Sequence, residues 1–354
     1  MSKTPLSSPP KSMSSTRIIT KLTQLLGTST PIVVPPMAAA AGGALAAQAR
    51  IAGAFGFIPA GYKSPEWLQS EISLARSLLP PSPSDTILPV GVGYFGWQLD
   101  KEEDPSESIP PTLKTALSNS VQAIWFSFGT NLGKWVHLVR KHSPKTIIFI
   151  LANTVQEGRT AIEEWKADVL VCQGNESGGH GLSSSPPLSA FLPSILPFSS
   201  TTPILAAGGL ATGSHIASML TLGASGAVLG TRFLLTSESF YSPAQRQVLI
   251  NSDSTSTVRT MAFDIARNTL EFPSGVDGRG IRNETVQDFE NGLDPENLNK
   301  RYIAGLALGD TARIVVWAGT GVGLMNSVKP AAELIKELHY ECVQRLHAGS
   351  NMLS

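Results

Sequence analysis

Cysteine is nearly absent from this sequence, which has two in 354 residues, Cys172 and Cys342. Two cysteines so far apart supply neither a disulfide framework nor the paired spacing of a zinc site. We therefore expect that the protein resides in a reducing compartment, and we predict a cytoplasmic location. Cys172 falls inside an apolar run, so we interpret it as a small buried hydrophobic residue.

Excess charge and long apolar runs are lacking as well. Lysine and arginine number 27, and aspartate and glutamate also number 27, so the formal net charge is zero. This balance gives no basic surface for nucleic acid, which we exclude as a partner. No apolar run approaches the roughly 18 residues of a membrane span, so no membrane association is expected.

The first 16 residues lack the apolar core of a secretory signal and contain no arginine. They are rich in serine and proline, and arginine is typical of transit peptides, so we predict a disordered tail over residues 1–16.

Eight short apolar runs dominate the next part of the chain and alternate with segments that carry helix signals. The runs are "PIVVPP", "AFGFIPAG", "ILPVGVGYFG", "VQAIWFSFG", "TIIFILAN", "DVLVCQG", "PILAAGG" and "GAVLGTRF". Continuous apolar strands joined by helices are typical of a parallel sheet buried on both faces. The sequence therefore predicts an α/β fold, a (β/α)8 TIM barrel over residues 17–239, with an open doubly wound sheet as the alternative.

The alternation stops after Arg232. Residues 240–310 are polar and carry helix signals, which predicts a small, mostly helical inserted lobe over one face of the barrel. Residues 311–354 are predicted to pack back on the barrel. Within them "IVVWAGTGVG" resembles a dinucleotide loop, but too little chain follows for a dinucleotide half-domain. We interpret Gly319, Gly321 and Gly323 as a loop over the barrel mouth.

The ends of the seventh and eighth runs predict a phosphate site. Gly208 and Gly209 follow one strand, and Gly230 and Thr231 follow the next. Turns that expose backbone N–H groups near helix starts bind phosphate at this position of such barrels. We place the N-cap of the intervening helix at Ser214. The alternative is that these glycines only permit tight turns.

The stretch "QGNESGGHG" after the sixth run predicts a catalytic loop. Gln173 offers an amide donor and acceptor, and Gly178 and Gly179 let a flat ligand approach the backbone. His180, in a loop on the expected active face, is the candidate base. Five other histidines are expected on helix faces or at the surface, and none has metal-ligand spacing, so no metal is predicted: His137, His142, His215, His339 and His347.

The segment "PPMAAAAGG" from Pro35 to Gly43 follows the first run. Its small residues suit either a flat ligand against the backbone near Met37 or a small-residue helix packed on the barrel.

Together, "PIVVPPMA", "AGAFGFIPAGY", "VCQGNESGGHG", "ILAAGGLATG" and "AVLGTRFLLTSES" resemble the nitronate monooxygenases over about residues 22–324. The resemblance implies a TIM barrel holding non-covalent FMN, with alkyl nitronates, and neutral nitroalkanes as further candidate substrates, oxidised by O2 to a carbonyl compound and nitrite. It implies that His180 is the base and that FMN contacts come from Pro35, Pro36, Met37, Gln173, Gly178, Gly179, Gly208, Gly209, Gly230 and Thr231. The sequence departs from the usual family pattern at Ser177, Gly181 and Thr320, positions that bear on substrate choice.

Two other functions fit the same residues. One is an NAD(P)H-dependent flavin reductase of quinones or enoyl thioesters, which shares the barrel and the glycine turns. The other is a non-redox barrel, either an isomerase that uses His180 or a phosphometabolite-binding protein. Reduction of a bound flavin by NAD(P)H, or a protein that takes up no flavin, distinguishes them.

Overall fold

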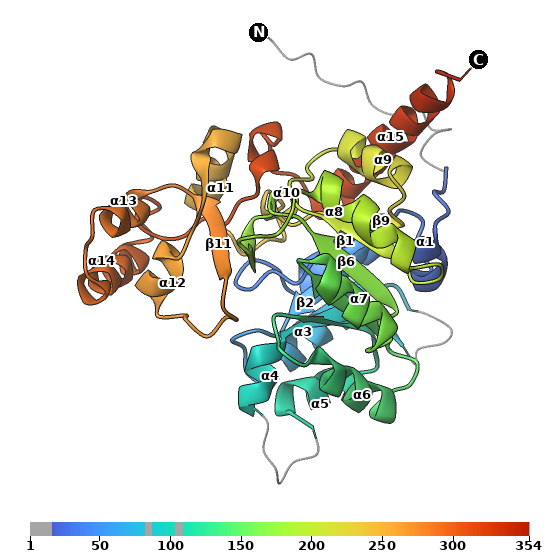
Figure 1. Ribbon diagram of the computed structural model, residues 1–354, viewed down its shortest axis with the longest axis horizontal. Helices are drawn as coiled ribbons and strands as arrows, with labels where there is room; N and C mark the ends of the chain where they lie inside the picture. Colours follow the sequence, from blue (N-terminus) through green and yellow to red (C-terminus); the bar gives the residue numbers. More distant parts are fainter. Residues whose placement is uncertain (1–15, 82–86, 103–108, 354) are drawn as a thin grey trace.

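The computed structural model describes residues 16–81, 87–102 and 109–353, so almost all of the predicted tail lies outside the described residues. Eight parallel strands close into a barrel in the order β1-β2-β3-β4-β5-β6-β8-β9 (Figure 1). The strands are β1 (Ile32–Val34), β2 (Phe55–Pro59), β3 (Leu88–Phe95), β4 (Val121–Ser127), β5 (Ile147–Ala152), β6 (Val169–Gln173), β8 (Ile204–Ala207) and β9 (Gly226–Val228). Each coincides with one of the eight predicted runs, which confirms the barrel over the open sheet.

Both faces of these strands are buried, which explains their continuous apolar sequences. In β2, Phe55 and Phe57 point into the barrel, while Ile58 joins the outer layer. Inside, Trp125 and Phe149 pack edge-on against Phe57, with ring centroids 5.1 and 5.0 Å from its own. The barrel interior is therefore a packed core and not a channel, and ligand space is left only at its ends.

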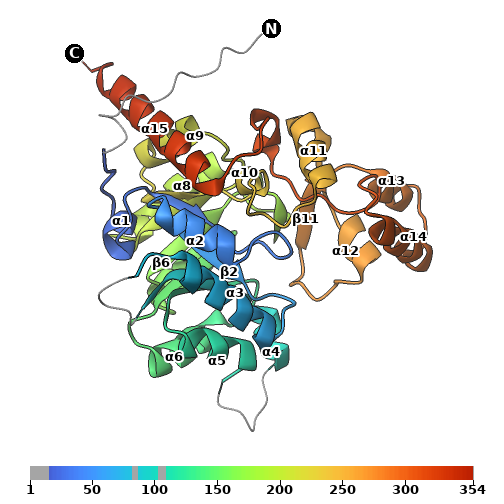
Figure 2. The ribbon, with the colours of Figure 1, turned by 180° about the vertical axis from the view of Figure 1, so that it is seen from behind.

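Helices cover the outside of the barrel (Figure 2). They are α2 (Gly43–Ile51), α3 (Pro65–Leu78), α4 (Gly96–Glu102), α5 (Pro111–Ser118), α6 (Leu132–His142), α7 (Val155–Glu163), α8 (Leu188–Ile195) and α9 (Gly213–Thr221), with a 3-10 turn η1 (Leu196–Phe198). Helix α1 (Lys21–Leu26) instead packs Leu22 and Leu26 against the interior side chains, and α10 (Thr231–Leu234) lies at the carboxyl ends of the strands. Their boundaries follow local chemistry. Ser64 and Thr154 accept backbone N–H bonds as N-caps of α3 and α7, and Gly27 ends α1 with φ 65°. The small-residue segment at Pro35–Gly43 divides into a loop and the first residue of α2.

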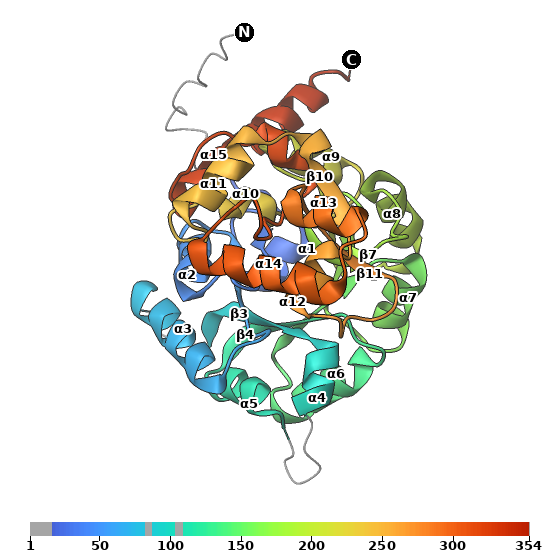
Figure 3. The same cartoon turned by 90° about the vertical axis from the view of Figure 1, so that its left-hand side faces the viewer.

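A lobe stands against one end of the barrel (Figure 3). It contains α11 (Pro243–Asn251), η2 (Ser254–Ser256), β10 (Thr257–Thr260), α12 (Ala262–Arg267), β11 (Val276–Ile281), α13 (Glu284–Glu290) and α14 (Pro295–Leu308). Strand β7 (Gly179–Leu182), from the barrel half of the chain, completes a three-stranded sheet in the order β10-β11-β7. His180 pairs with Gly278 in this sheet. The predicted loop position of His180 is therefore wrong, because the segment is a strand held by the lobe.

The C-terminal segment returns to the barrel through η3 (Thr320–Leu324) and α15 (Ala331–Ser350). Glu341 of α15 accepts bonds from the backbone N–H groups of Gly213 and Ser214 at 2.9 and 3.1 Å. The N-cap of α9 is Thr212, whose hydroxyl accepts from the His215 N–H, so the predicted N-cap at Ser214 is wrong by two residues. No described helix has the length and apolar character needed to cross a membrane.

Candidate active site

A cavity of about 570 Å³ opens at the carboxyl ends of the barrel strands. Its volume lies within the roughly 300–1,000 Å³ of small-molecule sites. Ser127, Gln173, Ala207 and Val228 line it from the ends of β4, β6, β8 and β9, and the lobe lines the other side through side chains that include Tyr302. The lobe therefore forms one wall of the cavity, which a bare barrel end would lack.

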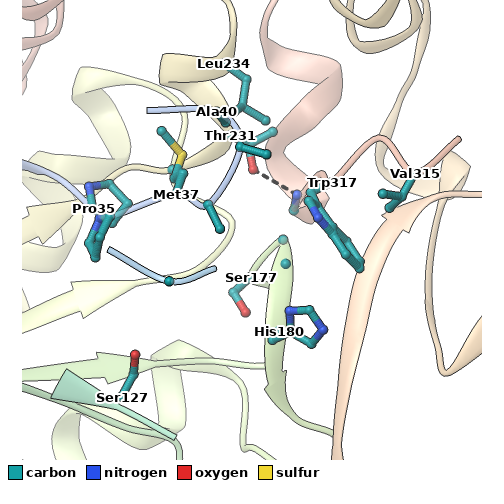
Figure 4. A pocket seen from close by; sticks show the side chains of 18 of the residues that line it. Pro35, Met37, Ala40, Ser127, Ser177, His180, Thr231, Leu234, Val315 and Trp317 are labelled. Carbon is teal, nitrogen blue, oxygen red and sulfur yellow. Dashed lines mark hydrogen bonds between the residues drawn. The ribbon is translucent and has the colours of Figure 1, made fainter. Parts of the chain in front are cut away.

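Every residue predicted for the site lines this one cavity. The structure thus brings together the loop after β1, the end of β6, strand β7 and the turns after β8 and β9: Pro35, Pro36, Met37, Gln173, Gly178, Gly179, His180, Gly208, Gly209, Gly230 and Thr231. Figure 4 shows Pro35, Met37 and Thr231 on one side of the space and Ser177, His180 and Trp317 on another. Their roles toward a cofactor or substrate stay predictions.

The glycines of "SGGHG" have different surroundings. A Cβ on Gly178 would lie 2.5 Å from backbone atoms of Ala318 and Gly319, so this glycine admits the chain's own returning segment. Gly179 has φ 71°, and a Cβ there would meet nothing within 4 Å. Gly179 is therefore the glycine of the pair that leaves open space.

The backbone N–H groups near the predicted phosphate site are more restricted than the sequence suggests. The first N–H groups of α9 are already bonded to Glu341 and Thr212, so that helix start is not open to an anion. The turn at Gly208 and Gly209, with φ of 118° and 68°, and the start of α10 remain. Thr231 Oγ1 accepts from the Gly319 N–H at 2.9 Å and keeps its own proton to donate. The backbone N–H groups left open for the predicted phosphate are therefore those of the Gly208–Gly209 turn and the start of α10, and the start of α9 is not among them.

His180 is held on three sides. Its Nε2 lies 2.8 Å from Asp264 Oδ1. Phe272 stacks on the imidazole with centroids 3.8 Å apart and an 11° angle, and Trp317 lies 5.1 Å away at 56°. The His180 side chain is 12% exposed, and its Nδ1 makes no hydrogen bond within the described residues. One ring nitrogen is thus committed to the protein, and the other is available to a ligand.

Asp264, Phe272 and Trp317 are functional candidates that the sequence analysis missed. Asp264 is on α12, and its side chain is 1% exposed. Thr269 Oγ1 donates to the same Oδ1 at 2.8 Å. No local pattern links residue 180 to residue 264, because the contact depends on the pairing of β7 with β11.

Gln173 is oriented by its neighbours. Asn153 Nδ2 donates to its Oε1 at 3.0 Å, and its Nε2 donates to the His180 carbonyl at 3.2 Å. The second proton of that amide remains for a ligand. Nearby, Ser177 Oγ is buried and has no hydrogen-bond partner. A buried hydroxyl without a partner at a cavity wall is expected to bond a bound molecule.

Arg267 brings a positive charge to this mostly apolar space. It lines the cavity, and among the described residues its partner is the Trp317 ring, 5.9 Å from the guanidinium carbon, with no ion pair or hydrogen bond. Burial raises the pKa of Tyr62 to about 12 and also raises the pKa of Tyr241 and of Tyr302, so these three phenols of the cavity stay neutral. Among the described residues that line the cavity, no carboxylate offsets the charge of Arg267 directly, which suits an anionic ligand.

The remaining histidines do not share this setting. His215 Nδ1 accepts from the Ala211 N–H at 3.1 Å, and burial lowers its pKa. His339 was expected on a helix face and lies on α15, but it is buried, with Nε2 2.6 Å from the Thr16 carbonyl oxygen. Within the described chain no three His, Cys, Asp or Glu residues gather as metal ligands. Both cysteines are free and buried, as expected for Cys172.

The fold is a closed barrel with a mainly apolar cavity at the carboxyl ends of its strands. The cavity is lined by a histidine oriented by hydrogen bonding and stacking and by the glycine turns of the last two strands. These features are typical of a barrel enzyme that acts on a small molecule. The family model for nitronate monooxygenase matches residues 19–341, so the chain belongs to the nitronate monooxygenase family. It is accordingly a flavin-dependent oxidoreductase, and oxidation of nitronates is the reaction of that family.

Individual proteins agree with this assignment. A nitronate monooxygenase of Neurospora crassa is 28% identical, over 95% of this chain and 96% of its own. The nitroalkane oxidase of Streptomyces ansochromogenes has a TM-score of 0.74 and 26% identity, covering 94% of this chain and all of its own. FabK from Thermotoga maritima has a TM-score of 0.77 at 24% identity, covering 95% of this chain and all of its own, and shares the fold.

Proposed function

We propose that this protein binds FMN non-covalently in the cavity and oxidises alkyl nitronates with molecular oxygen to a carbonyl compound and nitrite. The observation that carries the proposal is the placement of His180. His180, whose Nδ1 makes no hydrogen bond within the described residues, lines the same cavity as the glycine turns after β8 and β9. We further propose that neutral nitroalkanes are accepted, with His180 as the base that converts them to nitronates.

The residues present fit FMN. Gly208, Gly209 and the start of α10 offer backbone N–H groups for its phosphate. The unpartnered Ser177 hydroxyl and the free proton of Gln173 Nε2 are polar groups for the ring edge, in a cavity that is otherwise largely apolar. A flavin, when bound, supplies the electron acceptance from a carbanion that side chains cannot provide.

The chain's own contribution is a proton acceptor in an apolar site. His180 Nδ1 takes the proton from the carbon beside the nitro group, and the electron pair stays on the carbon–nitrogen unit as the nitronate. Phe272 and Trp317 cover the imidazole and limit water around it. A preformed nitronate has already lost this proton and does not need His180 as a base.

The first test is the visible absorbance spectrum of the purified protein, repeated anaerobically after ethyl nitronate and, separately, after NADH. We expect a yellow protein that nitronate bleaches and NADH leaves unchanged. Bleaching by NADH alone would support the NAD(P)H-dependent reductase instead. A colourless protein that cannot be reconstituted with FMN would favour the non-redox barrel.

The second test separates the two substrates. His180→Asn removes the base, so kcat/KM for nitroethane should fall about 10²- to 10⁴-fold, the usual contribution of general base catalysis. Activity on ethyl nitronate should largely remain. His142→Asn, at an exposed position on α6, is the matched control and should change neither. Equal losses on both substrates would contradict the assignment of His180 as the base.

Location in the cytoplasm is also a proposal. It rests on the two cysteines, which are free and buried and form no disulfide with each other.

A further inference from the structure

The lobe places the carboxylate of Asp264 against His180, and only one of the two carboxylate oxygens accepts hydrogen bonds. Asp264 Oδ1 lies 2.8 Å from His180 Nε2 and accepts from Thr269 Oγ1, also at 2.8 Å. Asp264 Oδ2 is buried with no hydrogen-bond partner. A buried polar atom without a partner destabilises the folded state. A site that keeps such a group therefore points to a role beyond packing.

We propose that Asp264 is a positioning residue that holds the proton of the neutral imidazole on Nε2 and so presents Nδ1 of His180 to the cavity as the proton acceptor. The proposal rests on the proposed function of His180 as the base for neutral nitroalkanes. It assigns that base a partner from a different part of the chain.

The geometry selects the tautomer. A carboxylate oxygen can only accept, so the imidazole nitrogen facing Asp264 must carry the hydrogen. Nδ1 then has a lone pair and makes no hydrogen bond within the described residues, and it keeps some accessible surface. The other tautomer would place two acceptors, Nε2 and Oδ1, 2.8 Å apart, and would leave a donor at the position that has to accept.

The surroundings hold this arrangement in place. The backbone of His180 is fixed by pairing with Gly278 of β11, and Phe272 stacks on one face of the ring. Arg259 donates a hydrogen bond to the Gly181 carbonyl oxygen at 2.6 Å and forms an ion pair with Asp277. These two contacts connect β7 to the lobe next to His180. The backbone of His180 is thus fixed relative to the lobe, and rotation of the imidazole away from Asp264 would break its stacking on Phe272.

The same pair stabilises the product of proton transfer. When Nδ1 receives the proton from carbon, His180 becomes an imidazolium whose Nε2–H remains bonded to the Asp264 carboxylate. Opposite charges at this distance in a site of low exposure attract more strongly than in water. Loss of Asp264 should therefore impair deprotonation of nitroalkanes and leave the oxidation of preformed nitronates unaffected.

The experiment combines a tautomer measurement with a substrate comparison. Long-range ¹H–¹⁵N correlation spectra of ¹⁵N-histidine-labelled holoenzyme report the protonated nitrogen of each of the six histidines. His180→Gln assigns the signal. We expect the Nε2–H tautomer in the wild type. In Asp264→Ala we expect loss of that preference and a 10²- to 10⁴-fold fall in kcat/KM for nitroethane, in line with the buried aspartate of a serine-protease triad.

A conservative variant separates charge from geometry. In Asp264→Asn the amide oxygen can keep both hydrogen bonds, so the tautomer should be retained while the charge is lost. We expect a fall in kcat/KM on nitroethane that is smaller than the fall in Asp264→Ala, because the hydrogen bond to Nε2 is kept. Asp310→Ala removes an exposed carboxylate from the same lobe and should change neither spectrum nor rate.

Several results would overturn the proposal. An Nδ1–H tautomer of His180 in the wild type would do so without any variant, even if Asp264→Ala fails to fold. Equal losses on nitroethane and ethyl nitronate in a folded Asp264→Ala protein would reduce Asp264 to a structural residue. If the wild type oxidises neither substrate, the proposed function fails, and the tautomer spectrum still decides whether Asp264 sets the state of His180.

Discussion

Phe272 connects the lobe to the barrel, and its removal should loosen that connection measurably. The residue lies between α12 and β11. Its ring stacks on His180 at 3.8 Å and meets Phe95, Trp97 and Phe128 of the barrel at centroid distances of 5.4 to 5.5 Å. Phe272→Ala removes all four ring contacts and does not change Asp264.

The expected magnitude follows from the burial of the ring. Truncation of a fully buried phenylalanine costs about 3–5 kcal/mol. Phe272 is only partly buried, so we expect about 2 kcal/mol, which corresponds to a roughly 30-fold change in an equilibrium constant. Because the contacts join the lobe to the barrel, this free energy should appear as local opening of the lobe before global unfolding.

Hydrogen exchange measures that opening directly. In Phe272→Ala the amides of α12 should exchange about 30-fold faster, while those of the barrel strands change little. Phe198→Ala is the matched control, since Phe198 is 39% exposed on η1 and contacts Arg159. Unchanged exchange in α12, or equal effects of the two substitutions, would refute the view that Phe272 fastens the lobe.

Two further predictions concern charge. Arg267→Met should raise KM about 10- to 100-fold for a nitronate that bears a carboxylate, since a hydrogen bond to a charged group contributes about 1.5–3 kcal/mol. For ethyl nitronate, which has no carboxylate, KM should rise less than about twofold. Equal changes in KM for both substrates would contradict a role of Arg267 in binding the carboxylate. Burial lowers the pKa of His215 below its usual 6.5, so the stability it contributes is full above that value and falls as the solution is acidified. The melting temperature should drop from about pH 7.5 to about pH 5 less steeply in His215→Gln than in the wild type, and parallel curves would exclude the role of His215.

The barrel was predictable from sequence because its signals are local. Each parallel strand is buried on both faces, and its sequence is therefore a continuous apolar run. The glycine turns and His180 could be singled out for a similar reason, since they lie in the segments that connect a barrel strand to the next helix.

The remainder of the site depends on contacts between distant residues, which local patterns do not encode. Asp264 is an ordinary helix residue until β7 pairs with β11 and brings His180 to it. Ser214 was chosen as an N-cap by residue type, whereas Thr212 has the extended backbone that a cap needs. The hydrogen bonds from the start of α9 to Glu341 could not be predicted, because they depend on where α15 packs on the barrel.

Strand β7 has a consequence for engineering this protein. Its one partner in the three-stranded sheet is β11, although β7 (Gly179–Leu182) precedes the lobe, which begins at residue 240, by a long stretch of barrel sequence. A chain cut near residue 239 would keep β7 and lose its partner, exposing an unpaired strand edge of the kind that recruits other chains. The excised lobe would bear the complementary open edge on β11. Grafting a different lobe onto this barrel would therefore require the graft to supply a strand in register with Gly179–Leu182, and fragments made without one should aggregate.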